Sequence, residues 1–160
     1  MSEALVLPPD ARAKLQLWRA AAARVVFTNG VYDLLHRGHV EYLEEARSLG
    51  DRLLVGMNTD ASVRRLKGSS RPIVGESDRA ALVAALACVD LVVLFDDDTP
   101  LRLIEAVQPD VLVKGADYAV ADIVGRDVVE ARGGLVATIA LRPGLSTSEI
   151  VRRIREGKGA

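Results

Sequence analysis

The two histidines of the chain lie within one four-residue window, at positions 36 and 39. The window follows an apolar run and precedes a stretch with helical spacing, so it falls where a helix begins. Unpaired N–H groups and the positive end of the helix dipole favour a phosphate at such a place. If the first turn is helical, residues three apart share one face, and both imidazoles point at the same anion. Gly38, between them, allows backbone to approach a ligand closely. We favour this interpretation over the alternative that the two side chains only cap and pack the helix end.

The elements around this window follow from hydrophobic periodicity. The apolar run 24–28 predicts a short buried strand, and residues 40–49 show helical spacing up to Gly50. Further strands are predicted at 52–58, 89–95, 110–114 and 135–140, and further helices at 60–66, 77–87, 127–132 and 147–155. Thr99 and Pro100 are expected to open another helix as its cap and first-turn proline. Five apolar strands separated by helices predict an α/β fold, a single doubly wound, Rossmann-like domain whose five-stranded parallel sheet has helices on both faces.

We expect three parts along the chain. Residues 24–156 form the α/β domain, residues 1–23 form an N-terminal helical extension after Pro8-Pro9, and residues 157–160 form a disordered tail. The extension is amphipathic and rich in alanine, which favours a role in packing or at a dimer surface over a role in a binding site.

Polar residues gather where the predicted strands end. In parallel sheets of this kind, ligands bind at the carboxyl ends of the strands, where the strand order reverses. Lys67 and Arg71 lie in a basic loop that we expect to act as a lid over a phosphate, with a solvated surface loop as the alternative. Residues 146–149 have the pattern of a capping box, and the same helix start can also bind phosphate; both interpretations stay open. The remaining polar candidates at this edge are Thr28, Asn29, Gly30, Asp33, Asp60, Lys114, Gly115, Asp117 and Tyr118.

Composition excludes several classes of protein. The chain has 160 residues, 49% of them hydrophobic and 27% charged, which is typical of one soluble globular domain. A net charge of −1 and few aromatic residues argue against a nucleic-acid partner. The single cysteine, Cys88, is expected to be a small core residue in a reducing cytoplasm. We expect no membrane association, because no apolar stretch has the length of a membrane span.

Missing motifs narrow the function further. The sequence contains no GxxxxGK[ST] loop, no GxGxxG after a strand, no CxxC pair and no HExxH. The sequence therefore argues against a P-loop ATPase, a dinucleotide-binding enzyme and a zinc hydrolase. A serine hydrolase lacks its GxSxG turn.

The stretch from Thr28 to His39 resembles the GxFDxxHxGH signature of the cytidylyltransferase-like nucleotidyltransferase superfamily. The segment 109–118 is similar to that of the heptose 1-phosphate adenylyltransferase branch, and the resemblance extends over residues 24–154. Three residues depart from the usual pattern: Tyr32 replaces Phe, Ala116 replaces a common Gly, and Ser148 stands where Thr is frequent. Ala116 could narrow the sugar site.

The resemblance implies transfer of AMP from ATP to D-glycero-β-D-manno-heptose 1-phosphate, giving ADP-heptose and pyrophosphate. It implies catalytic roles for His36, His39 and Lys67, and nucleotide binding by Thr28, Asn29, Gly30, Gly38, Ser146, Thr147 and Ser148. The sugar phosphate or ribose would contact Asp33, Asp60, Arg71, Lys114, Gly115, Asp117 and Tyr118. Mg²⁺ would arrive on the ATP phosphates, with no metal site of the protein's own. A cytoplasmic homodimer, supplied with heptose phosphate by a separate sugar kinase, is also implied.

Two other functions remain open from the sequence. A sister enzyme such as a glycerol 3-phosphate cytidylyltransferase would share the fold and use CTP. A non-enzymatic nucleotide-binding module would bind nucleotide without turnover, and the intact histidine pair together with Lys67 argues against it.

Overall fold

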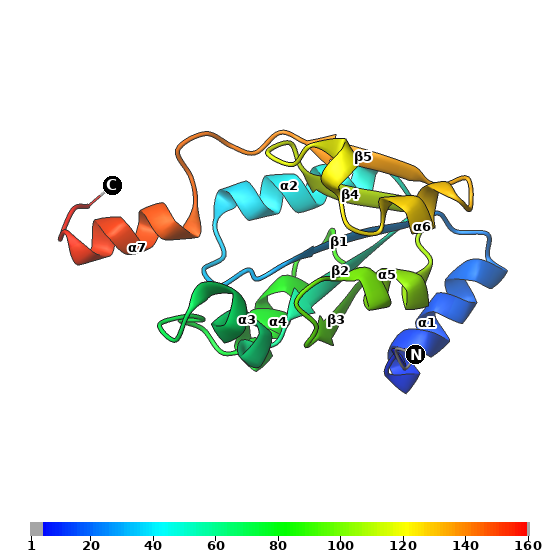
Figure 1. The fold of residues 1–160 in the computed structure, drawn as a ribbon, viewed down its shortest axis with the longest axis horizontal. Coiled ribbons are helices and arrows are strands. Elements are labelled where there is room, and N and C mark those ends of the chain that lie inside the picture. Colours follow the sequence, from blue (N-terminus) through cyan, green and yellow to red (C-terminus); the bar gives the residue numbers. More distant parts are fainter. Residues whose placement is uncertain (1–4, 160) are drawn as a thin grey trace.

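The computed structural model describes residues 5–159, so residues 1–4 of the expected extension and residue 160 of the expected tail lie outside it. The strands are β1 (Val25–Gly30), β2 (Arg52–Asn58), β3 (Leu91–Phe95), β4 (Val111–Gly115) and β5 (Leu135–Ile139) (Figure 1). The α-helices are α1 (Pro9–Ala20), α2 (Arg37–Ser48), α3 (Asp60–Lys67), α4 (Glu76–Ala84), α5 (Leu101–Val107), α6 (Arg126–Glu130) and α7 (Thr147–Arg155). A 3₁₀ turn, η1 (Val120–Asp122), follows β4.

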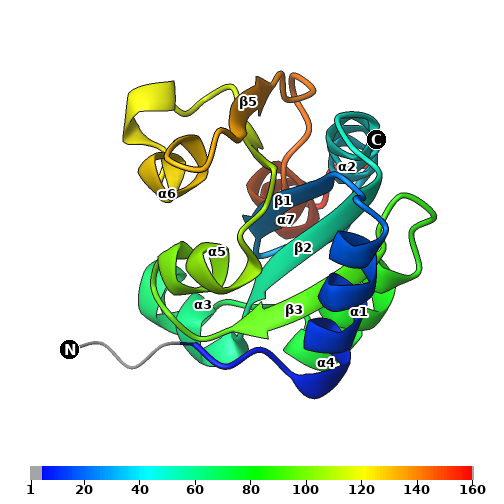
Figure 2. The same ribbon diagram turned by 90° about the vertical axis from the view of Figure 1, so that its right-hand side faces the viewer.

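The five strands form one parallel sheet in the order β3-β2-β1-β4-β5. Val26 at the centre of β1 pairs with Leu53 of β2 on one side and with Val111 of β4 on the other. Figure 2 shows β1, β2 and β3 side by side. Along the chain, β2 and β3 are added in turn on one side of β1, and β4 and β5 are then added on its other side. The strand order therefore reverses between β1 and β4, and the predicted doubly wound parallel sheet is confirmed.

Both faces of the central strands β1, β2 and β4 are largely buried, which explains why these strands are nearly continuous apolar runs. Neighbouring residues of a strand point to opposite faces, and Val26 and Phe27 are both fully buried in different core clusters. Phe27 packs in the cluster that includes Leu15 of α1, and Val26 packs in the one that includes Leu43 of α2. Helices α5 and α6 contribute to the first cluster and α4 to the second.

Some element boundaries differ from the sequence prediction. The predicted cap at Thr99 is wrong, because α5 begins at Leu101 with Pro100 in the capping position and no side-chain cap bond. Proline fits there because its φ angle is preset and its missing N–H would have no helical partner. Helix α2 begins at Arg37, so the first turn after His36 is helical.

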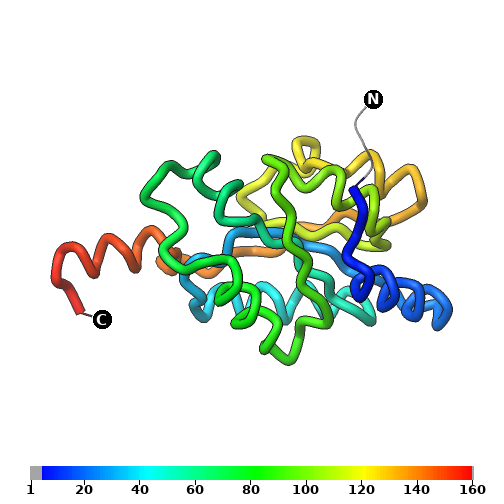
Figure 3. Tube along the Cα trace, turned by 90° about the horizontal axis from the view of Figure 1, so that it is seen from below, coloured from blue at the N-terminus to red at the C-terminus, as the bar shows by residue number. Residues whose placement is uncertain are grey.

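The first and last helices lie at opposite ends of the molecule (Figure 3). Ala11 and Leu15 of α1 are buried in the core, so this helix packs onto the sheet domain. None of the nine residues of α7 is buried, and Ile154 is 69% exposed. No helix within residues 5–159 has both the length and the apolar character that a bilayer crossing requires.

Candidate active site

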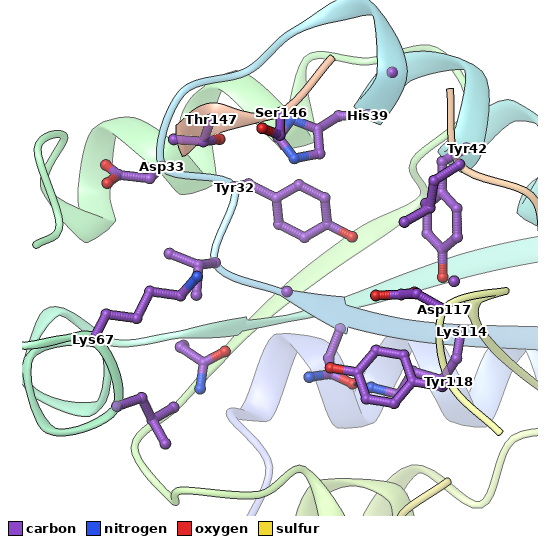
Figure 4. A pocket seen from close by; sticks show the side chains of 18 of the residues that line it. Tyr32, Asp33, His39, Tyr42, Lys67, Lys114, Asp117, Tyr118, Ser146 and Thr147 are labelled. Atoms are coloured by element: carbon purple, nitrogen blue, oxygen red, sulfur yellow. Dashed lines mark hydrogen bonds between the residues drawn. The ribbon is translucent and has the colours of Figure 1, made fainter. Parts of the chain in front are cut away.

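A cavity of about 640 Å³ opens at the carboxyl ends of the strands, around the point where the strand order reverses. The structure brings most of the predicted site residues to its walls (Figure 4). They are Asn29, Gly30, Asp33, His36, Gly38, His39, Lys67, Arg71, Lys114, Gly115, Asp117, Tyr118, Ser146, Thr147 and Ser148. The loops after β1, β2, β4 and β5 all contribute, as expected of parallel strands whose ends meet at one edge.

Two predicted residues do not line this cavity. The Thr28 side chain is fully buried, and its hydroxyl lies 2.8 Å from that of Tyr42. Asp60 lies beside a separate hollow with Glu76, and its Oδ1 accepts a hydrogen bond of 2.7 Å from Arg79. Both side chains are therefore engaged by the protein itself rather than turned toward the cavity.

The histidine pair forms a compact stacked unit at the start of α2. His36 has extended backbone and caps the helix, and His39 is the third helical residue. Their rings stack with centroids 3.8 Å apart and an interplanar angle of 17°. The Tyr32 ring meets His39 edge-on at 5.2 Å. The backbone N–H of His36 donates to Nδ1 of His39 at 3.4 Å, so the ring proton of a neutral His39 resides on Nε2.

Burial keeps both imidazoles neutral near pH 7. It lowers the pKa of His39 to about 4, with a smaller contribution from His36, and it also lowers the pKa of His36. Within the described residues, Nδ1 of His36 is buried without a hydrogen-bond partner. Each ring thus carries one N–H that can donate to an anion, without a fixed positive charge.

Gly38 makes room for this pair. A Cβ at this position would lie 3.1 Å from Cε1 and Nδ1 of the His36 ring, closer than ordinary contact. The glycine between the two histidines therefore serves the packing of an imidazole, in addition to its place in the cavity wall.

The start of α7 lies beside the histidines. Ser146 caps the helix, and its hydroxyl accepts from the N–H of Glu149 at 3.1 Å. The carboxylate of Glu149 pairs with Arg152 at 2.6 Å, so only the serine half of the predicted capping box forms. Thr147 donates to the carbonyl of Leu34 at 3.4 Å, which ties this helix start to the loop before α2. Two helix N-termini thus converge on one cavity, an arrangement that favours bound phosphate.

A partly buried lysine joins the two strands between which the order reverses. Nζ of Lys114, on β4, donates to Oδ1 of Asn29, on β1, and lies 5.9 Å from the centre of the Tyr118 ring. Burial lowers the pKa of Lys114 to about 8. At pH 7 the lysine still carries its charge and adds to the positive potential of the cavity.

The two flanks of the cavity differ in character. Lys67, Arg71, Asp98 and Thr99 lie on the flank of β2 and β3, whereas Tyr118, Val124, Leu141 and Leu145 lie on that of β4 and β5. Figure 4 shows Lys67 on one side of the cavity and Tyr118 on the other. The basic side chains of the first flank, Lys67 and Arg71, therefore suit an anionic group, and the apolar side chains of the second suit a flat apolar group.

Several residues that line the cavity were not among the predicted site residues. Tyr42 follows His39 by three positions on the same face of α2, a spacing that could have revealed it. Tyr32 stands at the Phe position of the signature, so its place in the sequence pointed to the cavity. Arg142 and Leu145 carry no comparable signal, because only the tertiary fold brings them there.

Comparisons with known proteins agree on the family of this chain. The model of the cytidylyltransferase-like family matches residues 27–153. Bifunctional protein HldE of Geotalea uraniireducens is 55% identical over 159 residues, which cover 93% of this chain and 32% of that protein. HldE of Citrifermentans bemidjiense is 62% identical over 131 residues, covering 82% of this chain and 27% of the relative. The chain thus spans about a third of the length of these relatives.

Solved structures support the fold as well. The lipopolysaccharide core biosynthesis protein from Thermoplasma volcanium has a TM-score of 0.60 and 30% sequence identity. The match covers 75% of this chain and 97% of that protein.

Proposed function

The chain belongs to the cytidylyltransferase-like family, and we propose that it transfers AMP from ATP to D-glycero-β-D-manno-heptose 1-phosphate, releasing pyrophosphate and ADP-heptose. The observation that carries the proposal is the meeting of the stacked histidine pair with the start of α7 in one cavity. Identity of 55–62% with the HldE proteins, together with the resemblance of segment 109–118, supports this acceptor.

The proposed reaction needs alignment and charge neutralisation more than covalent help. A phosphate oxygen of the sugar phosphate attacks the α-phosphorus of ATP, the bond from that phosphorus to the β-bridging oxygen breaks, and pyrophosphate leaves with the electron pair. A phosphate monoester has a second pKa of about 6 and is largely dianionic at pH 7, so the attack requires no general base.

The histidines serve this reaction as hydrogen-bond donors. Nε2–H of His39 is directed by the bond that occupies Nδ1, and it donates to the triphosphate as charge moves onto the leaving group. We assign the β- and γ-phosphates to the N-terminus of α7, where Ser146, Thr147 and Ser148 line the cavity.

The contrast between the two flanks supports an assignment of the remaining groups. Lys67 and Arg71 neutralise the sugar phosphate, and Leu141, Leu145 and Tyr118 receive the adenine ring. Asp117, beside this apolar flank, accepts hydrogen bonds from ribose hydroxyls.

We propose that Mg²⁺ enters with ATP and is held by its phosphates, where it neutralises part of their charge. Within residues 5–159, no group of three or more His, Cys, Asp or Glu side chains is placed to hold a metal ion. We also propose that the protein works as a homodimer in the cytoplasm. Sedimentation of a monomer at working concentration would refute the dimer.

The test is pyrophosphate release with Mg²⁺, the heptose 1-phosphate, and ATP or CTP in parallel. Release with ATP alone is the expected result. Release with CTP alone would indicate a cytidylyltransferase. Nucleotide binding without release in either reaction would indicate another phosphate acceptor or a binding module, and glycerol 3-phosphate with CTP is the first acceptor to try next.

A further inference from the structure

Asp33 is almost fully occupied by another part of the chain. Its side chain is 3% exposed. Oδ1 accepts from the backbone N–H of Ile73 at 2.8 Å and of Val74 at 2.9 Å, and Oδ2 accepts from Nη1 of Arg71 at 2.6 Å. A carboxylate accepts about four hydrogen bonds, so little of this one remains for a ligand. All of these donors belong to residues 71–74, which are referred to below as the 71–74 segment.

The charge of Asp33 is maintained by these same donors. Burial alone raises the pKa of the carboxyl, but the hydrogen bonds from Val74, Arg71 and Ile73 outweigh burial, and the pKa lies below its ordinary value. The group is therefore an anion at neutral pH and attracts the Arg71 guanidinium.

Arg79 fixes the 71–74 segment from the opposite side. Its side chain is fully buried. Nε donates to the carbonyl of Val74 at 2.9 Å, Nη1 to that of Val31 at 2.6 Å, and Nη2 to that of Asn58 at 3.0 Å. Val31 follows β1 and Asn58 ends β2, so this one guanidinium joins the segment to two strand ends. Both backbone polar groups of Val74 are thereby held, the N–H by Asp33 and the carbonyl by Arg79.

We propose that Asp33 is a positioning residue, which together with Arg79 fixes the 71–74 segment and so holds the Arg71 guanidinium in the cavity wall against the acceptor phosphate. Arg71 lines the cavity, and its side chain is 17% exposed. A guanidinium has five N–H groups, so the bond to Asp33 leaves donors for a phosphate. The role toward the acceptor depends on the proposed function, whereas the role in holding the segment does not.

The first measurement is amide hydrogen exchange of residues 71–74 in the ligand-free chain. Asp33→Ala is expected to speed exchange at Ile73 and Val74 by about tenfold or more, because hydrogen bonds to a charged group are lost. Asp33→Asn keeps an acceptor oxygen for the two amides and is expected to have a smaller effect. Asp90→Asn is the matched control, since Asp90 also accepts from a backbone N–H, of Leu53, and from an arginine, Arg47, at the opposite edge of the sheet. It should leave exchange at 73 and 74 unchanged.

The second measurement separates the KM values of the two substrates. Both Asp33→Ala and Asp33→Asn release Arg71, and each is expected to raise the KM of the sugar phosphate about tenfold while changing the KM of ATP less than about twofold. Thermal unfolding checks that each variant is folded, and Asp33→Asn replaces Asp33→Ala if the latter is not.

Unchanged exchange at residues 73 and 74 in folded Asp33→Ala would overturn the proposal. A raised KM together with unchanged exchange would assign Asp33 to the substrate instead. If the chain uses a different acceptor, the exchange result still decides whether Asp33 holds the segment, so failure of the proposed function can be told apart from failure of this inference.

Discussion

His39 is the single side chain whose geometry bears most directly on the proposed chemistry. Its Nδ1 is occupied by the backbone of His36, and Tyr32 fixes the ring edge-on, so Nε2–H has a defined direction. Loss of one such donor in an active site typically removes roughly 2.7–4 kcal/mol of transition-state stabilisation.

His39→Ala is therefore expected to lower kcat by about 10²- to 10³-fold while the fold is retained. Steady-state kinetics, with circular dichroism as the check on folding, measure this. Near-normal turnover of the folded variant would remove the histidine from its assigned role.

Ionisation of Lys114 is expected to make kcat/KM depend on pH. Its pKa is lowered to about 8 by burial, so the free protein loses this positive charge as the pH rises through 8. Because kcat/KM reports ionisations of the free enzyme, it is expected to fall above about pH 8.

Lys114→Arg is the informative variant for this limb, because arginine stays protonated throughout the range. The decline of kcat/KM above pH 8 should disappear in the variant even if its overall activity is lower. An identical alkaline limb in both proteins would assign the ionisation to another group.

At the scale of elements, the start of α2 depends on the glycine between the histidines. A Cβ at position 38 would press on the His36 ring, which is already stacked on His39. Alanine is also a better helix former than glycine by about 1 kcal/mol, so the local helix does not suffer.

Gly38→Ala is expected to lower kcat about tenfold or more with an unchanged or higher melting temperature. Gly75→Ala is the matched control, because its Cβ would find only an ordinary contact of 3.6 Å with Asp60. Equal loss of activity in the two variants would refute a specific effect on the histidine pair.

The sequence predicts the elements well where burial decides them. Strands buried on both faces appear as apolar runs, and β2 has the bounds expected from its run. Helix starts were harder to place: the pattern favoured Thr99 as the cap of α5, but the cap is Pro100. A cap is decided by the path of the preceding loop, which local composition does not reveal.

At the scale of the whole molecule, the position of the cavity was predictable and its wall only in part. Parallel strand ends must meet at one edge, so the polar residues after β1 and β4 were found. The pairing of Asp33 with residues about 40 positions later leaves no trace in local spacing. Local spacing likewise does not reveal that Asp60 accepts a hydrogen bond from Arg79 and lies beside another hollow.

Stability of the whole chain is expected to decrease in mild acid. The pKa of His39 is about 4 in the folded chain, against 6.5 as the ordinary value. Between these values the unfolded chain binds the proton and the folded chain does not, so stability is lost as the pH falls from about 6.5 to about 4.

Urea unfolding at pH 7 and pH 5 measures this loss. We expect the free energy of unfolding to drop by about 1–2 kcal/mol from this group, and His39→Gln to reduce the drop. Wild type and variant with the same pH dependence would exclude His39 as its source.

The exposure of α7 has a consequence for regulation. Its first turn lines the cavity, yet none of its residues is buried, so the body of the domain stabilises this helix only weakly. If a nucleotide binds at its N-terminus as proposed, it stabilises the helix, and the coupling is reciprocal. By the same coupling, a contact that stabilised the helix at its exposed Ile154 would raise nucleotide affinity without entering the cavity.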